Sequence, residues 1–436
     1  MKKSYFLSLI MIFALLLSAA PTARSNNSGS TPSLRRGSED VVLQWNRVLT
    51  ETFAMPGQHP GSIAAARSYA MMHAAMFDAV NSIDGSYTPY LIDIPGTKHA
   101  SIEAAAAQAA HDVLVALYPA RAADFDLELQ ASISGLRENR VRQGLRFGRE
   151  AAAALLAARA NDGWTTPGPA YVLPPVPGNW QPTPPANAPA AFTHYPAVTP
   201  FALVSSSQFI PPPPPTLASP EYAAALNEVK EIGSVGSLSR SADQTQQATA
   251  WLSVATPVLV AVVWNNIART LAVQQGNTTV ENARMFALMN ISHHDGFQTS
   301  FASKFEHGLW RPVTAIRRAD EDDNPATAPD PGWTSLIGNP PYPTYAGNMA
   351  AIGMSNAGIL ALFFGRDDLP VQYAFPVSPH HPNGVTRSWA SLSAIADEMA
   401  KSREYGGIHF SFDSVAGQSI GINTSNYIYQ NFMTPR

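Results

Sequence analysis

Cysteine is absent from the 436-residue sequence. Disulfide bonds, thiolate nucleophiles, iron–sulfur clusters and zinc sites built on cysteine are therefore excluded. A lipid anchor on an N-terminal cysteine is excluded for the same reason. The fold must rely on noncovalent packing, and hydrophobic residues make up 45% of the sequence while charged residues make up only 14%. One large domain or two ordinary ones could therefore bury a sizeable core.

An excess of positive charge is also absent. The 28 lysine and arginine residues are outnumbered by 32 aspartate and glutamate residues, which gives a formal net charge of −4. A nucleic-acid-binding domain normally carries a clustered basic surface, and nothing in the sequence indicates one. We therefore expect no nucleic-acid partner.

Long apolar runs are missing after the first residues. At the start, Lys2 and Lys3 precede a mostly apolar run at residues 5–17, and small residues follow at 18–23. The run is short for a transmembrane helix, and its flanks are typical of a secretory signal. We predict a signal peptide over residues 1–25, export to the periplasm or the extracellular space, and no stable membrane span in the mature chain. An uncleaved membrane anchor is the alternative.

Few segments alternate with a period of two, and most apolar residues recur at helical spacing. This pattern predicts an all-α fold, a helical bundle with negligible sheet. Many of the segments are rich in alanine, which favours helix formation and close contact between helices. The predicted helices cover residues 41–53, 62–80, 100–117, 123–136, 140–161, 221–232, 242–254, 258–274, 279–304, 348–364, 385–402 and 409–430.

Proline is dense between residues 163 and 220 and includes an unbroken run at 211–215. Neither a helix interior nor a central strand tolerates that density. A connection of this length is unusual inside a domain, so it should pack on a surface or separate two halves. We predict an N-terminal helical half at 38–162, a proline-rich connection at 163–220 and a C-terminal helical half at 221–436.

Two cations flank a predicted helix end near Gly308. Lys304 lies in the last turn of the helix, and Arg311 stands directly before Pro312. Proline is well suited to the first turn of a new helix. The pair could bind an anion, and a solvated basic helix terminus is the alternative.

A second segment places Gly347 directly before the predicted helix 348–364. The first backbone N–H groups of a helix lack intrahelical acceptors and can point at an anion. An ordinary turn with Asn348 as the helix cap is the alternative, and it is compatible with anion binding.

The third segment joins Arg403 at a predicted helix end to His409 through the turn residues Gly406 and Gly407. We expect His409 to open the last helix, with Asp413 one turn further on the same face. A carboxylate there can hold one imidazole nitrogen and leave the other basic. The planar guanidinium of Arg403 suits an oxyanion. A purely structural His–Asp pair is the alternative.

Taken together, these segments resemble the superfamily of vanadium-dependent haloperoxidases and type 2 phosphatidic acid phosphatases. Its members share Lys-(six residues)-Arg-Pro, Pro-Ser-Gly-His and Ser-Arg-(five residues)-His-(three residues)-Asp segments, in that order. This sequence has the first and the third in full, which is a specific match. The region around Asp295 and the alanine-rich segment with Arg67, His73 and Asp78 also look like bacterial proteins of this type, so the resemblance covers most of the chain.

The resemblance implies two helical halves of the vanadium haloperoxidase type and a vanadate cofactor. His409 would be the axial ligand of the vanadium, or the nucleophile that attacks a phosphate ester, and Asp413 would orient it. The Gly347 amide would donate to the same oxyanion. The resemblance also implies that the oxyanion charge is neutralised by the cations Lys304, Arg311 and Arg403.

One position departs from the superfamily pattern. Asn348 stands where the second segment has its histidine, Ala346 replaces the serine and Tyr345 replaces the proline. An asparagine side chain can donate a hydrogen bond, but it cannot transfer a proton at useful pH. Because a lost acid–base group costs roughly 10²- to 10⁴-fold in rate, we expect weakened catalysis with oxyanion binding retained.

Three functions are compatible with these residues. The first is a vanadate-dependent haloperoxidase-like enzyme that oxidises halide with hydrogen peroxide, with Lys304 polarising the peroxide. The second is an acid phosphatase that acts on a phosphate ester with His409 as nucleophile. The third is a non-catalytic oxyanion-binding protein, which Asn348 would explain. The chain length, the extra N-terminal helices and the export signal favour the first.

Overall fold

Helices account for most of the structure, a computed structural model that describes residues 39–436 except 56, 59–60, 96 and 254–258. The predicted signal peptide lies outside the described residues. The described helices are α1 Val41–Ala54, α2 Ser62–Asp84, α3 Ile102–Leu117, α4 Ala122–Ile133, α5 Glu138–Arg159, α6 Pro220–Ile232, α7 Ala242–Ser253, α8 Leu259–Gln275, α9 Thr279–His307, α10 Pro312–Arg317, α11 Asn348–Phe364, α12 Leu392–Tyr405 and α13 Ser411–Asn431. The predicted all-α bundle is confirmed.

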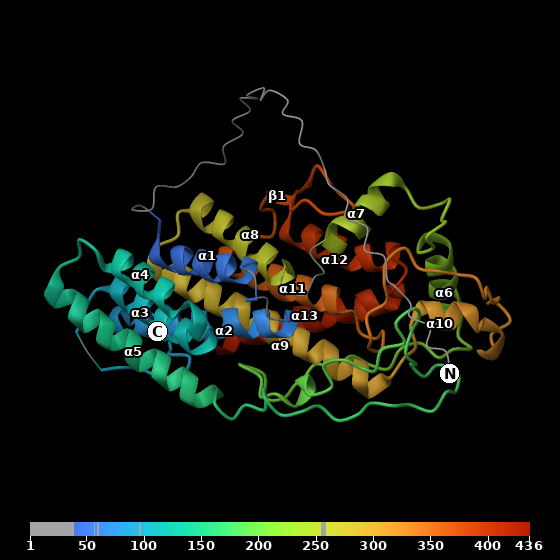
Figure 1. Ribbon diagram of the computed structural model, residues 1–436, viewed down its shortest axis with the longest axis horizontal. Helices are drawn as coiled ribbons and strands as arrows, with labels where there is room; N and C mark the ends of the chain where they lie inside the picture. Colours follow the sequence, from blue (N-terminus) through green and yellow to red (C-terminus); the bar gives the residue numbers. More distant parts are fainter. Residues whose placement is uncertain (1–38, 56, 59–60, 96, 254–258) are drawn as a thin grey trace, which may run out of the picture. The chain divides into compact units, whose positions relative to one another are not determined.

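The long helix α9 connects the two ends of the bundle. It packs against α2 on one side and against α11 and α13 on the other, while α3 and α5 pack beside α2 (Figure 1). A capping box between Thr278 and Glu281 starts α9, and Gly308, at φ 61°, ends it. That left-handed conformation suits glycine and turns the chain sharply towards Arg311.

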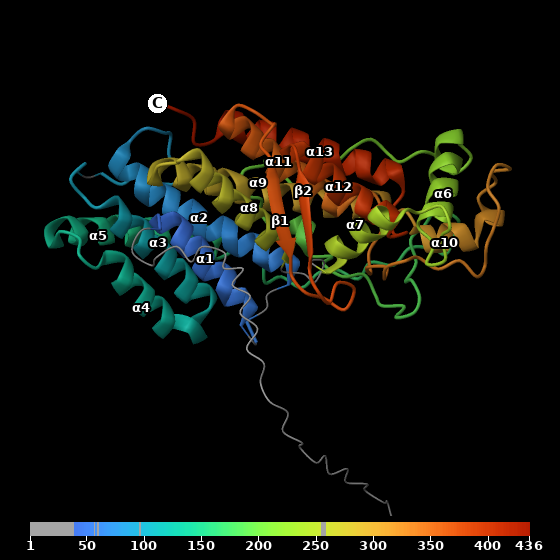
Figure 2. The same ribbon diagram turned by 90° about the horizontal axis from the view of Figure 1, so that it is seen from above.

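Small residues let α13 approach α11 closely (Figure 2). A Cβ atom on Gly417 would lie 2.3 Å from the Gly347 carbonyl oxygen, and one on Gly421 would lie 2.6 Å from the Ala351 carbonyl oxygen. Side chains at these positions would push the helices apart. The close contact brings the start of α13, with Asp413, against the start of α11, with Gly347.

One predicted helix boundary was wrong. Residues 385–402 do not form a single helix, because Val385–Trp389 forms strand β2, which pairs antiparallel with β1 at Val371–Phe375. Residues 385–389 include β-branched and aromatic side chains that favour a strand. Helix α12 begins only after Ser391, whose side chain accepts a hydrogen bond from the Ala394 N–H.

The proline-rich segment at 163–220 packs along the C-terminal half of α9 and the residues that directly follow this helix. The Trp180 N–H donates to the Gly308 carbonyl at 2.7 Å, and the Trp310 N–H donates to the Gly178 carbonyl at 2.8 Å. The Gln298 side chain donates to the Tyr195 carbonyl at 2.9 Å. These hydrogen bonds therefore hold the proline-rich segment against Gly308 and Trp310, which lie between Lys304 and Arg311 in the sequence.

The residues from Asp40 to Arg436 form one compact unit. Helix α2, from the predicted N-terminal half, packs directly on α9, from the predicted C-terminal half. The division into two halves and a connection remains a prediction about how the sequence is organised. None of the helices in the described part of the chain is long and apolar enough to cross a membrane.

Candidate anion-binding site

Lys304 is fully buried in the last turns of α9. Its Nζ donates to the carbonyl oxygens of Thr344 and Ala346, both at 2.6 Å. An ammonium group has three donors, so one remains for a further acceptor. Burial lowers the pKa of Lys304 well below its usual value, the nearby Arg311 lowers it further, and Asp413 opposes the shift.

Arg311 is equally buried and is held by backbone carbonyls. Its Nε donates to Tyr342 at 2.9 Å, its Nη1 to Ile408 at 2.9 Å and its Nη2 to Pro343 at 3.3 Å. Nη1 also lies 3.3 Å from Nε2 of His409. Burial lowers the pKa of Arg311 to about 10. The side chain is therefore a cation in a fixed orientation beside the imidazole.

Arg403 differs because part of its guanidinium has no partner. Its Nε lies 3.2 Å from Ser402 Oγ, but Nη2 has no hydrogen-bond acceptor among the described residues, although it is buried. Burial lowers the pKa of Arg403 to about 10. A buried donor without a partner is costly unless a ligand or water supplies the acceptor.

His409 and Asp413 form the predicted pair, but the helix start beside them differs from the prediction. Helix α13 begins at Ser411 with Phe410 as its N-cap, so His409 precedes the helix rather than opening it. The Asp413 Oδ2 nevertheless lies 2.8 Å from His409 Nδ1. It also accepts from the Phe410 N–H at 3.0 Å and from the Thr344 hydroxyl. These two hydrogen bonds fix the position of the carboxylate, and the carboxylate in turn orients the imidazole.

The surroundings of the His409 imidazole favour its neutral form. Burial lowers its pKa well below the usual value, and the charges of Arg311, Lys304 and Arg403 add to the shift. Burial also raises the pKa of Asp413, against hydrogen bonds from Thr344 and Phe410 and the charge of Lys304. A proton on Nδ1 donated to Asp413 leaves the lone pair on Nε2, the atom that faces Arg311.

The expectation for Gly347 changes. Its N–H donates to the Asp413 carbonyl at 2.8 Å, so it links α11 to α13 and is already engaged. Gly347 is the N-cap of α11, and Asn348 is the first helical residue. The backbone N–H groups of Asn348 and Met349 have no acceptor in the described structure. They are the donors at this helix start that can meet an anion.

Two residues of the site were missed at the sequence level. Thr344 contacts both Asp413 and His409, with its hydroxyl 3.1 Å from His409 Nδ1. Tyr342 places its ring 5.5 Å from Lys304 Nζ and 5.1 Å from the Arg311 guanidinium carbon. Thr344 directly precedes Tyr345, where the second segment begins, and Tyr342 stands two residues before Thr344, in a proline-rich turn whose sequence gives no sign of where these side chains lie.

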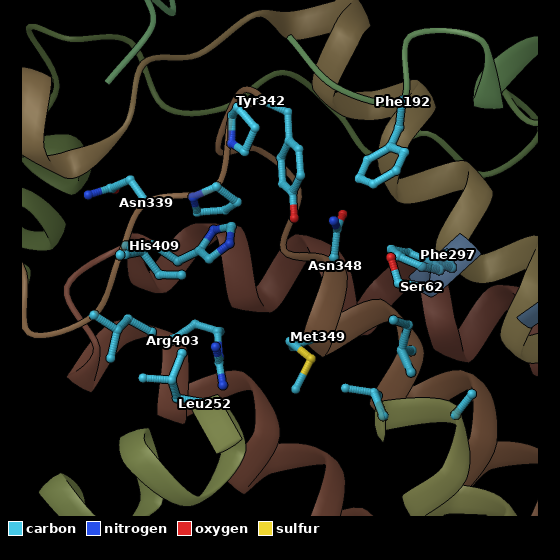
Figure 3. A pocket seen from close by; sticks show the side chains of 18 of the residues that line it. Ser62, Phe192, Leu252, Phe297, Asn339, Tyr342, Asn348, Met349, Arg403 and His409 are labelled. Atoms are coloured by element: carbon cyan, nitrogen blue, oxygen red, sulfur yellow. The ribbon is translucent and has the colours of Figure 1, made fainter. Parts of the chain in front are cut away.

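Asn348 is held between two hydroxyl groups. Its Oδ1 accepts from Ser300 Oγ at 2.8 Å, and its side chain also hydrogen-bonds to Tyr342, whose hydroxyl points towards it in Figure 3. Burial raises the pKa of Tyr342, and Arg311 and this hydrogen bond oppose the shift. Tyr342 is therefore a protonated group facing Asn348.

A cavity of about 450 Å³ opens onto these side chains. Figure 3 shows Arg403 and His409 on one side, Tyr342 and Asn348 in the middle, and Phe297 and Ser62 on the other side. Lys304, Arg311 and Asp413 are not part of its lining and stand behind it. The predicted residues therefore come together in two layers, one that faces the cavity and one that supports it with charge and hydrogen bonds.

Comparison with known proteins gives a family match over the C-terminal part of the chain. Residues 284–435 match the family model of the VCPO second helical-bundle domain. Vanadium chloroperoxidase of Curvularia inaequalis is 24% identical over 283 residues, which cover 50% of this chain and 45% of that protein. The chain thus spans about half the length of this curated relative.

Two solved structures share the fold across most of both chains. A bacterial vanadium-dependent iodoperoxidase has a TM-score of 0.74 at 21% identity and covers 91% of this chain and 96% of its own. A holo-type bacterial vanadium-dependent chloroperoxidase has a TM-score of 0.71 at 15% identity and covers 91% and 98%. The chain has the vanadium haloperoxidase fold, and its residues 284–435 match a family model of that group. At these identities the solved structures show the superfamily fold, and the activities in their names belong to those proteins.

The other positions at which the sequence resembles bacterial proteins of this type do not line the cavity. They are Arg67, His73, Asp78 and Asp295. Arg67 pairs with Asp162 at 2.8 Å, and His73 lies 2.9 Å from the Asn46 amide. Asp78 accepts three backbone N–H groups, and so does Asp295. These residues build the superfamily fold rather than its anion site.

Proposed function

We propose that the chain is a vanadate-dependent haloperoxidase-like enzyme that oxidises halide with hydrogen peroxide. The observation that carries the proposal is the charge around His409. Burial lowers its pKa, the charges of Arg311, Lys304 and Arg403 lower it further, and Asp413 is the carboxylate that contacts this ring in the described structure. Buried like charges are costly without a counterion, so the arrangement is suited to an oxyanion with more than one negative charge.

The residues fit vanadate. Nε2 of His409 carries a lone pair that can act as its ligand, and the unpartnered Nη2 of Arg403 can donate to an oxygen. The first-turn N–H groups of Asn348 and Met349 are further donors. Lys304 and Arg311 would supply charge and their remaining N–H groups from behind. When bound, vanadate supplies a Lewis-acid centre that activates hydrogen peroxide towards reduction by a halide.

The chain's own groups would hold and move the proton. Asn348 cannot transfer one, but the Tyr342 hydroxyl beside it stays protonated and faces the same cavity. It can donate to an oxygen held near Asn348. His307, which lies between Lys304 and Arg311 in sequence, faces away, with Nε2 3.3 Å from the Pro211 carbonyl.

The second candidate is an acid phosphatase with His409 as nucleophile. It is favoured by the neutral imidazole, its ordered Nδ1 contact with Asp413 and the cationic surroundings, since phosphate and vanadate share charge and geometry. The third candidate, an oxyanion-binding protein without catalysis, is favoured by Asn348. Export to the periplasm or the extracellular space is also part of the proposal, and it rests on the predicted signal peptide at residues 1–25.

The deciding experiment sets two assays side by side on the full chain. Oxidation of bromide and iodide by hydrogen peroxide is measured with and without added vanadate, and hydrolysis of an aryl phosphate is measured without it. Vanadate-dependent halide oxidation is the expected result. Ester hydrolysis alone would identify a phosphatase, and vanadate binding with neither activity would identify a binding protein.

A further inference from the structure

Basic side chains gather on α5, although the chain as a whole carries more acidic than basic residues. Five arginines fall between residues 137 and 149, and all of them are exposed: Arg137, Arg140, Arg142, Arg146 and Arg149. The acidic residues of the same helix are Glu138 and Glu150. The net charge of −4 gave no sign of a clustered basic surface, and for this helix that expectation was wrong.

The packing of α5 decides which of its sides meets solvent. The helix packs against α2 and α3 and lies at the edge of the bundle in Figures 1 and 2. A Cβ atom on Gly144 would be 2.4 Å from the Ser101 carbonyl oxygen, so this side of α5 is pressed against the start of α3. Arg142, Arg146 and Arg149 are four and three residues apart, which places them together on the opposite side. They form a row about 10 Å long.

Most of the charge in this row is not neutralised within the chain. The side chains of Arg142 and Arg149 make no hydrogen bond or ion pair with any described residue. Arg146 pairs with Glu150 at 2.9 Å, and both side chains are exposed. Glu103 is the exposed carboxylate at the start of α3, and it accepts a hydrogen bond from the N-cap of its own helix. The row therefore presents at least two free guanidinium groups to solvent.

The loop before α3 adds a further cation. The Arg146 guanidinium donates to the Pro95 carbonyl at 3.2 Å, and the Arg140 guanidinium donates to the His99 carbonyl at 2.8 Å. These two hydrogen bonds hold the loop beside α5, and Lys98 on this loop is exposed. We call the following side chains the α5 basic patch: Lys98, Arg137, Arg140, Arg142, Arg146 and Arg149.

The surroundings of the α5 basic patch narrow the chemistry of a partner. None of the exposed large hydrophobic side chains in the described part of the chain lies on α5. A protein interface core and a helix inserted into a membrane surface both need such side chains. Single-stranded nucleic acids need aromatic stacking platforms, and Phe147, the aromatic residue of α5, is buried. Exposed guanidinium groups in a row suit a flexible chain of repeated anionic groups.

We propose that the α5 basic patch binds an acidic polysaccharide. Successive carboxylate or sulfate groups of the polymer would lie along Arg142, Arg146 and Arg149. The predicted export would bring the chain to the compartment in which such polymers occur. Residues of α5 do not line the cavity beside His409, so binding would hold the chain on the polymer without using the residues of the proposed reaction. The proposal is therefore independent of the proposed function.

Binding can be measured on the full chain without vanadate or turnover. Dextran sulfate and polygalacturonate are compared with neutral dextran at low and high salt. We expect binding to at least one anionic polymer and none to neutral dextran, with affinity that falls as salt screens the exposed charges. The two anionic polymers distinguish sulfate from carboxylate recognition. Absence of binding to both at low salt would overturn the proposal.

A triple variant tests whether the row carries the binding. Arg142→Gln, Arg146→Gln and Arg149→Gln together should weaken polymer binding about 10-fold, because each exposed ion pair contributes a few-fold. Glutamine keeps the helix propensity of arginine, and vanadate affinity should not change. The matched control removes three arginines that pair with carboxylates outside α5, Arg121→Gln, Arg318→Gln and Arg366→Gln. Equal weakening in both triple variants would assign the binding to total charge and refute the patch.

Two further ligands test the class of partner. Double-stranded DNA and vesicles of phosphatidylglycerol are measured at the same salt concentration. A duplex or a vesicle is wider than the row and would also face the carboxylates of a chain with a net charge of −4, whereas a single polymer chain can follow the row. We expect weaker binding to both than to the polysaccharide. Tighter binding to either one, lost in the α5 triple variant, would identify a different partner and contradict the proposal.

Discussion

Helices α2 and α9 share an arginine and an aspartate at the same spacing, but only α9 contributes a residue to the anion site. Arg67, His73 and Asp78 in α2 have the same spacing as Arg284, Asn290 and Asp295 in α9. Each aspartate accepts three consecutive backbone N–H groups, from Tyr90 to Ile92 for Asp78 and from Phe201 to Leu203 for Asp295. The shared residues are therefore a structural frame, used once in each predicted half.

The two frames meet in a buried polar network. His73 contacts Asn46 of α1 at 2.9 Å, and Asn290 contacts Asn265 of α8 at 2.9 and 3.0 Å. Asn46 donates to Asn265 at 2.7 Å and joins the two pairs. The difference between the helices lies beyond the aspartate, because α2 ends at Asp84 whereas α9 continues to His307. Lys304 lies in that extension, so α9 contributes a residue to the anion site and α2 does not.

The first prediction compares a histidine of the anion site, His409, with the histidine of the α2 pattern, His73, by replacing each with alanine. We expect His409→Ala to weaken vanadate binding more than about 100-fold, since loss of an orienting group alone costs 10- to 100-fold and His409 is the proposed ligand itself. His73→Ala should keep vanadate affinity and lower the free energy of unfolding by about 2–4 kcal/mol, because it empties a buried ring site. Calorimetric titration and urea unfolding of both variants measure this. Equal vanadate affinity for wild type and His409→Ala would refute the assignment.

Asn348→His should raise activity, by up to about 10²- to 10⁴-fold if the imidazole is well oriented. The new side chain would stand between Ser300 and Tyr342, facing the cavity. Ester hydrolysis should gain more than vanadate affinity does, because protonation of the leaving group matters only in the transition state. Asn348→Gln is the matched control, an amide that adds bulk without a transferable proton. A similar rate for both variants and the wild type would show that proton transfer is supplied elsewhere, with Tyr342 the first residue to test.

Two variants, each lacking one of the two carboxylates, test whether Asp78 and Asp295 have the same structural role. Asp78→Ala and Asp295→Ala each leave three backbone N–H groups without their acceptor, and we expect each to lower the free energy of unfolding by about 3 kcal/mol or more. Chemical denaturation checks the two values, and the asparagine variants, which keep one acceptor oxygen, should lose less. A loss for one aspartate and none for the other would break the proposed equivalence of the helices.

The smallest expected effect on vanadate affinity is that of Lys304→Met, which tests the part of α9 beyond Asp295. It removes one of three cations at similar length, so vanadate affinity should fall about 10- to 100-fold, the loss of one charged hydrogen bond. Lys401→Met is the control, because Lys401 is half exposed and pairs with Glu404. The idea that Lys304 contributes directly fails if both variants bind vanadate as the wild type does.

The sequence predicted most of the helices because apolar spacing and caps act locally. It also predicted that His409 and Asp413 meet, although the helix starts at Ser411. It could not predict that the Gly347 N–H bonds to the Asp413 carbonyl, since that contact depends on how closely α13 approaches α11. Thr344 and Tyr342 were missed for a similar reason: their roles come from the fold of a turn, which no local pattern encodes. The hairpin of β1 and β2 depends on pairing between segments that helical spacing alone did not reveal.

The central claim is that His409, with Lys304, Arg311 and Arg403 around it, forms an oxyanion site. A crystal structure of the full chain with orthovanadate tests it most directly. The account predicts vanadate density within bonding distance of Nε2 of His409, with Nη2 of Arg403 and the Asn348 or Met349 N–H donating to its oxygens. Vanadate bound elsewhere, or an ordered cavity without vanadate beside His409 at saturating concentration, would contradict it.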